Sequence, residues 1–155
     1  MGGIVWAGFV AGVLAAGVFW IFRTLALTEL SATGQLGCIF YDDPRLPMTE
    51  TVGFGLFLAL HATLFAALYA AVLRGLGGPG WGTGLAAGGV HGLLTAAALP
   101  WLARASRCVR MGRLPPPGRL GLDWGQATPV ALIAGYAVYG GVFGAVLHAL
   151  STRAP

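Results

Sequence analysis

Two histidines stand in stretches of the chain that otherwise contain almost no polar side chain. His61 lies in "LALHATLFAAL" and His91 lies in "AAGGVHGLLTAAALP". An imidazole can bind a transition metal, serve as an axial ligand of haem iron, or take up and release a proton near neutral pH. These two residues are therefore the first candidates for chemistry in this sequence.

An ordinary structural use competes with these chemistries. A neutral imidazole inside an apolar helix can simply share a hydrogen bond with a carbonyl or hydroxyl group, and Thr63, Thr95 and Tyr69 are close enough in the sequence to be partners. We favour this interpretation. Ionisable groups inside a membrane span are costly, however, so a metal or haem site and a proton, ion or substrate pathway through His61 and His91 stay open beside it.

The composition of the chain indicates the setting of the histidines. Of 155 residues 57% are apolar and only 9% are charged, and the mean hydropathy is +0.78. Soluble domains carry about 25% charged residues, so the composition predicts an integral membrane protein. The net charge of +4 does not indicate a nucleic-acid partner, because the arginines lie in loops beside apolar runs.

Four segments are long and apolar enough to cross a bilayer, which takes about 20 residues of helix. They run from Ile4 to Leu27, Thr51 to Leu73, Trp81 to Ala103 and Pro129 to Leu150. Backbone polar groups in lipid must be satisfied within the segment, so the spans are expected to be helices and the fold class all-α. The apolar N-terminal stretch has no basic residues before it, so we expect the first helix to be retained.

The spacing also places both histidines near the middle of the membrane. His61 and His91 lie on consecutive spans joined by the short "RGLGGPG" connection. At 1.5 Å per residue their depths differ by roughly 6 Å. We expect the two spans to be antiparallel neighbours, so that the imidazole rings could face one another.

The arginines predict an orientation for the four spans. The side with the two long loops carries Arg23, Arg45, Arg104, Arg107, Arg110, Arg113 and Arg119, and the side with both termini carries Arg74 and Arg153. By the positive-inside rule, the long loops face the cytoplasm and the termini face outward. The expected location is a bacterial inner membrane.

Small residues recur every fourth position in each span, which lets helix backbones approach closely. The stripes comprise Gly8, Gly12 and Ala16; Ala62, Ala66 and Ala70; Gly84, Gly88 and Gly92; and Gly140 and Gly144. They predict a compact bundle, with one stripe left over for a partner helix.

The two halves of the chain show weak similarity to each other. "AALYAAVLRGL" of the second span aligns with "GGVFGAVLHAL" of the fourth, and "AGVLA" of the first with "GGVHG" of the third. The alignment predicts a single domain made of two similar hairpins, residues 1–76 and 77–155, in parallel duplication. Composition alone can produce such matches in Ala- and Gly-rich sequence.

The loops hold the remaining candidates. Arg104, Arg107, Arg110 and Arg113 follow the third span and are expected to contact lipid head groups or a partner. Cys38 and Cys108 both fall on the expected cytoplasmic side, so they should stay reduced, and neither belongs to a C-x-x-C pair. No metal, catalytic triad or phosphate loop is predicted, and we do not expect an enzyme.

The middle of the chain, "LHATLFAALYAAVL" and "GLAAGGVHGLLTAAALP", resembles small four-span bacterial membrane protein families of unknown function. The resemblance implies a fold and no activity. From the sequence we expect a small accessory or scaffolding subunit of a larger membrane complex, bound to lipids and to other transmembrane helices. The alternatives are an oligomeric transporter or proton pathway that uses His61 and His91, and a membrane anchor that binds haem b through the same pair.

Overall fold

The computed structural model describes residues 2–152, and every regular element in that range is a helix. Four helical segments are long and apolar enough to span a membrane: Gly2–Thr24, Pro47–Gly75, Trp81–Ala105 and Thr128–Ser151. The predictions of an all-α fold and of four spans are therefore confirmed.

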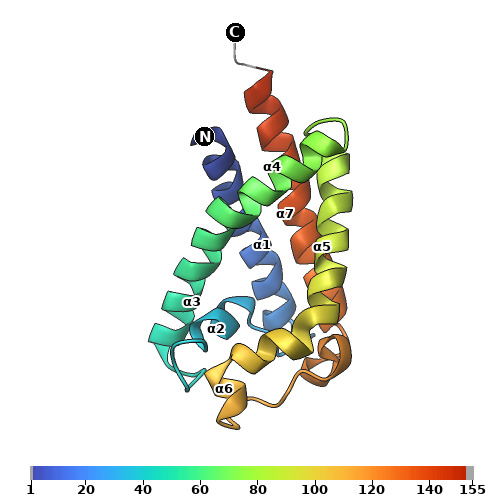
Figure 1. Ribbon diagram of the computed structural model, residues 1–155. Coiled ribbons are helices and arrows are strands. Elements are labelled where there is room, and N and C mark those ends of the chain that lie inside the picture. The colour runs from blue at the N-terminus through green and yellow to red at the C-terminus, as the bar shows by residue number, and fades with distance from the viewer. Residues whose placement is uncertain (1, 153–155) are drawn as a thin grey trace.

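The spans are built from five α-helices. They are α1 (Gly2–Thr24), α3 (Pro47–Leu60), α4 (Ala66–Gly75), α5 (Trp81–Leu102) and α7 (Thr128–Ser151). A π-helical turn, His61–Phe65, joins α3 to α4 and makes one continuous span of them. In Figure 1 α3 and α5 diverge from the α4 end of the molecule toward the opposite end.

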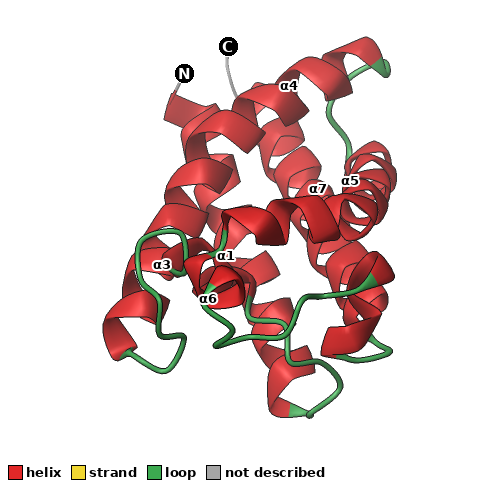
Figure 2. Ribbon diagram, turned by 60° about the horizontal axis from the view of Figure 1, so that its bottom comes forward, coloured by secondary structure: helices red, strands yellow, loops and turns green. Residues whose placement is uncertain are grey.

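The two long loops form that opposite end, which we call the cap (residues 25–46 and 103–127). It contains α2 (Ala32–Gly37), α6 (Arg107–Arg110) and two 3₁₀ turns, Ala103–Ala105 and Arg119–Trp124. The cap lies at the end of the bundle away from both termini (Figure 1), and Figure 2 shows its loops and α6 lying across that end.

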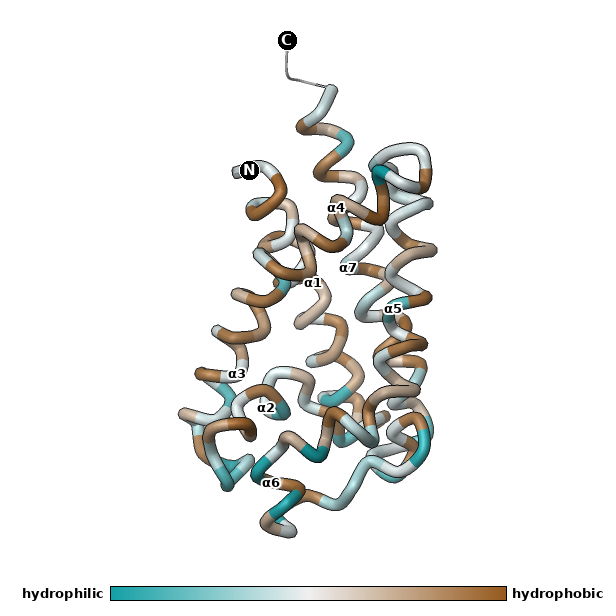
Figure 3. Tube along the Cα trace, viewed as in Figure 1, coloured by the Kyte–Doolittle hydropathy of each residue, from teal (hydrophilic) through white to brown (hydrophobic). Residues whose placement is uncertain are grey.

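Hydropathy along the chain matches a membrane setting. Apolar residues follow the spans and hydrophilic ones gather in the cap (Figure 3). Four tryptophans are more than half exposed: Trp20 and Trp101 near the cap, and Trp6 and Trp81 near the other end. Tryptophan is enriched at both bilayer interfaces, so these side chains fit two interfacial belts.

Glycines hold α5 directly against α7. A Cβ atom added to Gly84 would collide with the carbonyl group of Gly140, and one added to Gly88 would collide with the carbonyl group of Tyr136. Gly92 and Gly144 make similarly close backbone approaches. The predicted stripes therefore lie at a helix contact, but the contact joins α5 to α7 and does not bring α5 to the span that carries His61.

The glycines of α1 also lie at an internal contact. Gly8 packs against the backbone of the π-helical turn at His61 and Ala62, and Gly12 packs against the side chain of His61. Because all seven glycines expected to mediate packing are used inside the bundle, these stripes leave none free for a partner helix. The parallel duplication stays a prediction.

All the expected span ends except Trp81 differ from those of the structure, by one to four residues. The second span begins at Pro47, with Leu46 as its N-cap, because a proline at the first helical position needs no N–H partner. The fourth begins at Thr128, one residue earlier than expected, and Thr128 does not cap it. Its hydroxyl group shares a hydrogen bond of 2.6 Å with the Thr28 hydroxyl, which ties the cap to α7.

A disulfide joins the two halves of the cap. Cys38 and Cys108 are bonded, so the expectation that they stay reduced was wrong. Beside the bond, the Arg107 amide donates to the Cys38 carbonyl over 2.6 Å, and the Arg107 guanidinium donates to the Phe40 carbonyl over 3.1 Å. These contacts fix α6 against the loop that follows α2.

Candidate functional site

His61 lies at the start of the π-helical turn and is almost completely buried, with 1% of its surface exposed. A π-helical turn holds one residue more than an α-helical turn and frequently occurs at functional sites. No residue type in "HATLF" marks such a turn, so the sequence did not indicate it. The turn faces α1, whose small Gly8 and Gly12 leave room for it.

The hydrogen bonds of His61 define its tautomer. Its Nδ1 atom lies 2.7 Å from the Phe57 carbonyl oxygen, and because a carbonyl can only accept, Nδ1 must be the donor. In the neutral ring, Nε2 is then an acceptor with a free lone pair. Nε2 is buried and has no hydrogen-bond partner among the described residues.

Aromatic rings surround the His61 imidazole. The ring of Phe57 stacks on it at a centroid distance of 3.9 Å, and Tyr139 meets it edge-on at 4.8 Å. Phe65 and Tyr136 lie at 5.0 and 5.9 Å. An acceptor without a partner in such an apolar setting costs free energy, which makes Nε2 the exception to be explained in this core.

His91 belongs to the same aromatic cluster. Its ring lies 4.1 Å from Tyr136 and 5.0 Å from Phe65, so both of these rings contact both histidines. Its Nδ1 atom and the Tyr69 hydroxyl share a hydrogen bond of 3.0 Å. The two histidines thus share Tyr136 of α7 and Phe65 as neighbours, and α5 packs mainly on α7. That the two imidazole rings face one another stays a prediction.

Three hydroxyl partners were expected for the histidines: Tyr69 was right, Thr63 was wrong, and Thr95 lines the cavity with no described hydrogen bond to either histidine. Tyr69 bonds His91 as predicted. Thr63 instead donates to the Ala59 carbonyl on its own helix over 2.7 Å, because its side chain faces outward. The Phe57 carbonyl, which His61 uses, lies four residues earlier on the same span.

A cavity of about 360 Å³ lies beside this cluster. Its wall includes both histidines, Thr95 and Tyr136 from the spans, and cap residues such as Leu36 and Trp124 also line it. The lining is mostly apolar, and among the described residues it contains no Asp, Glu, Lys or Arg side chain. Cavities of this kind, apolar with a few polar groups, are typical of small-molecule sites.

A separate groove of about 400 Å³ runs between α4 and α5 on the far side of His91. It is lined by Tyr69, His91 and apolar side chains such as Leu68, Val90 and Leu94. The last three are more than half exposed, so this groove faces the lipid region. His91 therefore contributes to both the groove and the cavity.

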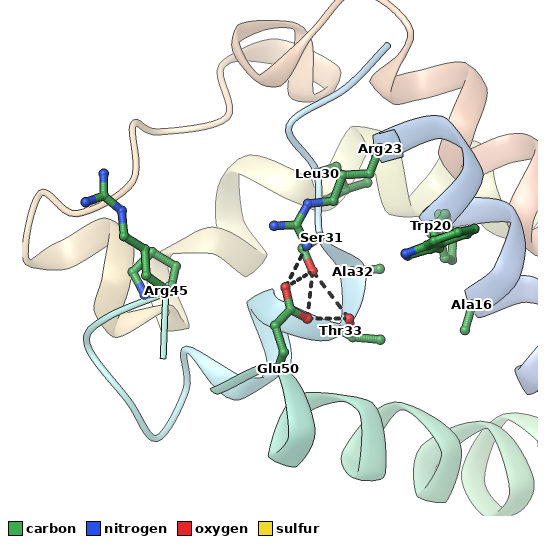
Figure 4. Close-up of a pocket in the computed structure, with 11 residues that line it drawn as sticks. Ala16, Trp20, Arg23, Leu30, Ser31, Ala32, Thr33, Arg45 and Glu50 are labelled. Atoms are coloured by element: carbon green, nitrogen blue, oxygen red, sulfur yellow. Dashed lines mark hydrogen bonds and ion pairs between the residues drawn. The ribbon is translucent and has the colours of Figure 1, made fainter. Parts of the chain in front are cut away.

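A third cavity, of about 430 Å³, lies where α1 meets α2 and α3 (Figure 4). Glu50 accepts hydrogen bonds from Arg23 over 2.7 Å, Ser31 over 2.8 Å and Thr33 over 2.8 Å. The polar groups satisfy one another, whereas the Arg45 side chain points away from them (Figure 4). We interpret this network as a clamp between α2 and the spans.

Two observations concern the metal and haem alternatives. Among residues 2–152 no cluster of three or more His, Cys, Asp or Glu side chains could hold a metal ion. Phe65 and Tyr136 each contact both imidazoles, and a haem held by the two histidines stays a prediction.

The basic residues of the cap are placed as follows. Arg104, Arg107, Arg110 and Arg113 are exposed. They do not follow one helix, because the backbone is extended at Ser106 between α5 and α6. The only ion pair among the described residues joins Arg23 to Glu50, so none of these four arginines forms an ion pair there. Arg153, counted in the orientation prediction, lies outside the described residues.

Family models, curated proteins and solved structures were all compared with the chain, and none of them matches it.

Proposed function

We propose that this protein binds a lipid-soluble small molecule in the cavity beside His61 and His91. The observation that carries the proposal is the coincidence of an apolar cavity with the unpartnered Nε2 atom of a histidine in its wall. A buried acceptor without a partner costs about 1–3 kcal/mol, and a bound molecule that supplies a hydrogen bond recovers part of that cost.

The lining supports an apolar occupant. Leu36, Leu99, Leu132 and the aromatic rings offer dispersion contacts, while Thr95 and the histidines can orient one polar group. The groove at His91 supports a supply of ligand from the bilayer, since it faces lipid on one side and shares this histidine with the cavity on the other.

Native mass spectrometry of the detergent-purified chain with para-nonylphenol as an apolar probe tests the proposal. We expect a complex of one chain with one molecule. Ala105→Trp should abolish it, because Ala105 lines the cavity and an indole there fills space that the probe needs. Ala67→Trp adds the same bulk to an exposed position of α4 and should leave the complex intact. Absence of the complex in the unaltered chain, or its survival in Ala105→Trp, would overturn the proposal.

For the orientation we propose that the cap faces the oxidising side of the membrane, which in a bacterial inner membrane is the periplasm. Disulfides persist in oxidising compartments and are rare in the cytosol, so the Cys38–Cys108 bond supports this side. The distribution of arginines supports the opposite side. We give the disulfide more weight than the arginines. A disulfide in the cap persists only in an oxidising compartment, whereas the positive-inside rule has exceptions.

Fusions at the C-terminus distinguish the two orientations. With the cap in the periplasm, the C-terminus lies in the cytoplasm, so a green fluorescent protein fusion should fluoresce and an alkaline phosphatase fusion should be inactive. If the alkaline phosphatase fusion is active and the green fluorescent protein fusion does not fluoresce, the C-terminus lies in the periplasm. The orientation indicated by the arginines would then be correct.

The accessory-subunit role stays a prediction and receives no support from the packing. It depended on a glycine stripe free for a partner helix, and the predicted glycines contact α7, the π-helical turn and one another. If mild-detergent purification recovered the chain in fixed stoichiometry with a second membrane protein, that role would replace our proposal.

A further inference from the structure

His61 lines the cavity, and the buried Nε2 atom of its ring, which has no partner among the described residues, also indicates which kind of polar group a ligand carries. Nδ1 of His61 is committed as a donor to the Phe57 carbonyl, which leaves Nε2 of the neutral ring able only to accept. A ligand whose polar group only accepts, such as an ester, an ether or a quinone carbonyl, cannot satisfy that atom. A ligand with a hydrogen to donate can.

The charges around the cavity also limit which hydrogen-bond donors a ligand can carry. An ammonium group could donate to Nε2, but no carboxylate lines the cavity to balance its charge, and an unpaired charge in an apolar cavity is very costly. The donor must therefore be neutral. Among neutral donors on membrane-soluble molecules, a hydroxyl group adds the least polar surface to an otherwise apolar body.

We propose that the ligand is an apolar molecule with a hydroxyl group that donates its hydrogen to Nε2 of His61. This inference rests on the proposed binding function and adds the substrate class, a membrane-soluble phenol or alcohol. The body lies against the apolar wall formed by Leu36, Leu99 and Leu132.

Matched pairs of probes test the inference without altering the protein. Para-nonylphenol and its methyl ether differ in the hydroxyl hydrogen, and dodecanol and its methyl ether form a second, aliphatic pair. In native mass spectrometry at equal probe concentrations, we expect the hydroxyl compound of at least one pair to bind about tenfold more tightly than its ether. The pair that shows the preference identifies the ligand body as aromatic or aliphatic.

A variant locates the hydrogen bond. His61→Phe keeps an aromatic ring but removes Nε2, so the hydroxyl compound should fall to the affinity of its ether while the affinity of the ether stays the same. His148→Phe is the matched control, because His148 is exposed on α7 and does not line the cavity.

The outcomes separate this inference from the proposed function. If the unaltered chain binds no probe, the binding function itself fails. If it binds hydroxyl compounds and ethers equally in both pairs, the cavity binds apolar molecules but the inferred hydrogen bond does not exist. If the preference for the hydroxyl compound survives in His61→Phe, another residue accepts the bond and the assignment to His61 is wrong.

Discussion

Tyr139 of α7 donates its hydroxyl hydrogen to the backbone carbonyl of His61 over 2.6 Å. Both residues are fully buried, and the bond links α7 to the π-helical turn of the second span. The same tyrosine lies edge-on to the His61 ring, so one side chain fixes the backbone and contacts the imidazole at once.

Tyr139→Phe should therefore destabilise the bundle while keeping the ring contact. Removal of the hydroxyl takes away a buried hydrogen bond to the His61 carbonyl, at an expected cost of about 0.5–1.5 kcal/mol. Thermal unfolding in detergent, followed by circular dichroism, measures the loss. Tyr41→Phe is the control, because no hydrogen bond of the Tyr41 hydroxyl is described, and equal melting of the two variants would count against the role of Tyr139.

Gly88→Ala should separate α5 from α7. The added methyl group would meet the Tyr136 carbonyl, so the helices must move apart, at a cost of about 1–3 kcal/mol or more. Gly89→Ala adds the same group one residue away, where nothing lies within 4 Å of the new atom. A lower melting temperature is expected for Gly88→Ala alone, because alanine favours a helix more than glycine does and Gly89→Ala meets no neighbour. An equal loss in both variants would show that the contact with Tyr136 is not its cause.

Glu50→Leu should release α2 from the end of α3. The change removes the acceptor of Arg23, Ser31 and Thr33, and we expect faster amide hydrogen exchange in residues 31–37. Exchange in α5 and α7 should stay unchanged. Glu29→Leu, at an exposed acidic position with no described side-chain partner, is the control. Unaltered exchange in α2 would show that apolar contacts alone hold it.

The cap disulfide should contribute to stability. It links residues 70 apart in the sequence, and closing a loop of that size is typically worth about 2–4 kcal/mol. The Cys38→Ser, Cys108→Ser double variant should melt at a lower temperature than the unaltered chain. Reductant should lower the melting temperature of the unaltered chain to that of the double variant. If reductant leaves the melting temperature of the unaltered chain unchanged, the result would argue that the disulfide does not form.

The exposed arginines of the cap should attract anionic lipid. Replacing Arg104, Arg110 and Arg113 by Gln should weaken the preference for anionic over neutral lipid by about 1 kcal/mol per residue near the surface. Lipid exchange followed by native mass spectrometry measures it. Arg74→Gln, at the opposite end of the bundle, should have no effect on lipid bound at the cap.

The sequence predicted what depends on composition and length. The four spans follow from apolar runs of sufficient length, and the seven glycines follow from their four-residue spacing. It could not predict which helices those glycines join, because Gly88 on α5 and Gly12 on α1 present the same small surface to any neighbour. Only the full packing assigns Gly88 to α7 and Gly12 to the turn at His61.

The candidate site was predicted in its residues but not in its details. His61 and His91 are conspicuous because they are polar in apolar spans. Tyr136 and Tyr139 were missed, since a tyrosine in a span is easily taken for another apolar side chain. The disulfide was missed because charge bias placed both cysteines in a reducing compartment, and nothing in the sequence between Cys38 and Cys108 indicates that they meet.

The π-helical turn at His61 determines the direction in which the side chains of α4 point around the helix axis. Each residue of a helix turns the chain by about 100°, so the extra residue of the turn rotates α4 by that angle relative to α3. Tyr69 faces His91 under this rotation. If residues 61–65 formed a regular α-helix at unchanged chain length, the Tyr69 hydroxyl would lie about a quarter of a turn away from its partner, whereas deletion of one residue within 61–65 would allow a regular helix that keeps Tyr69 facing His91.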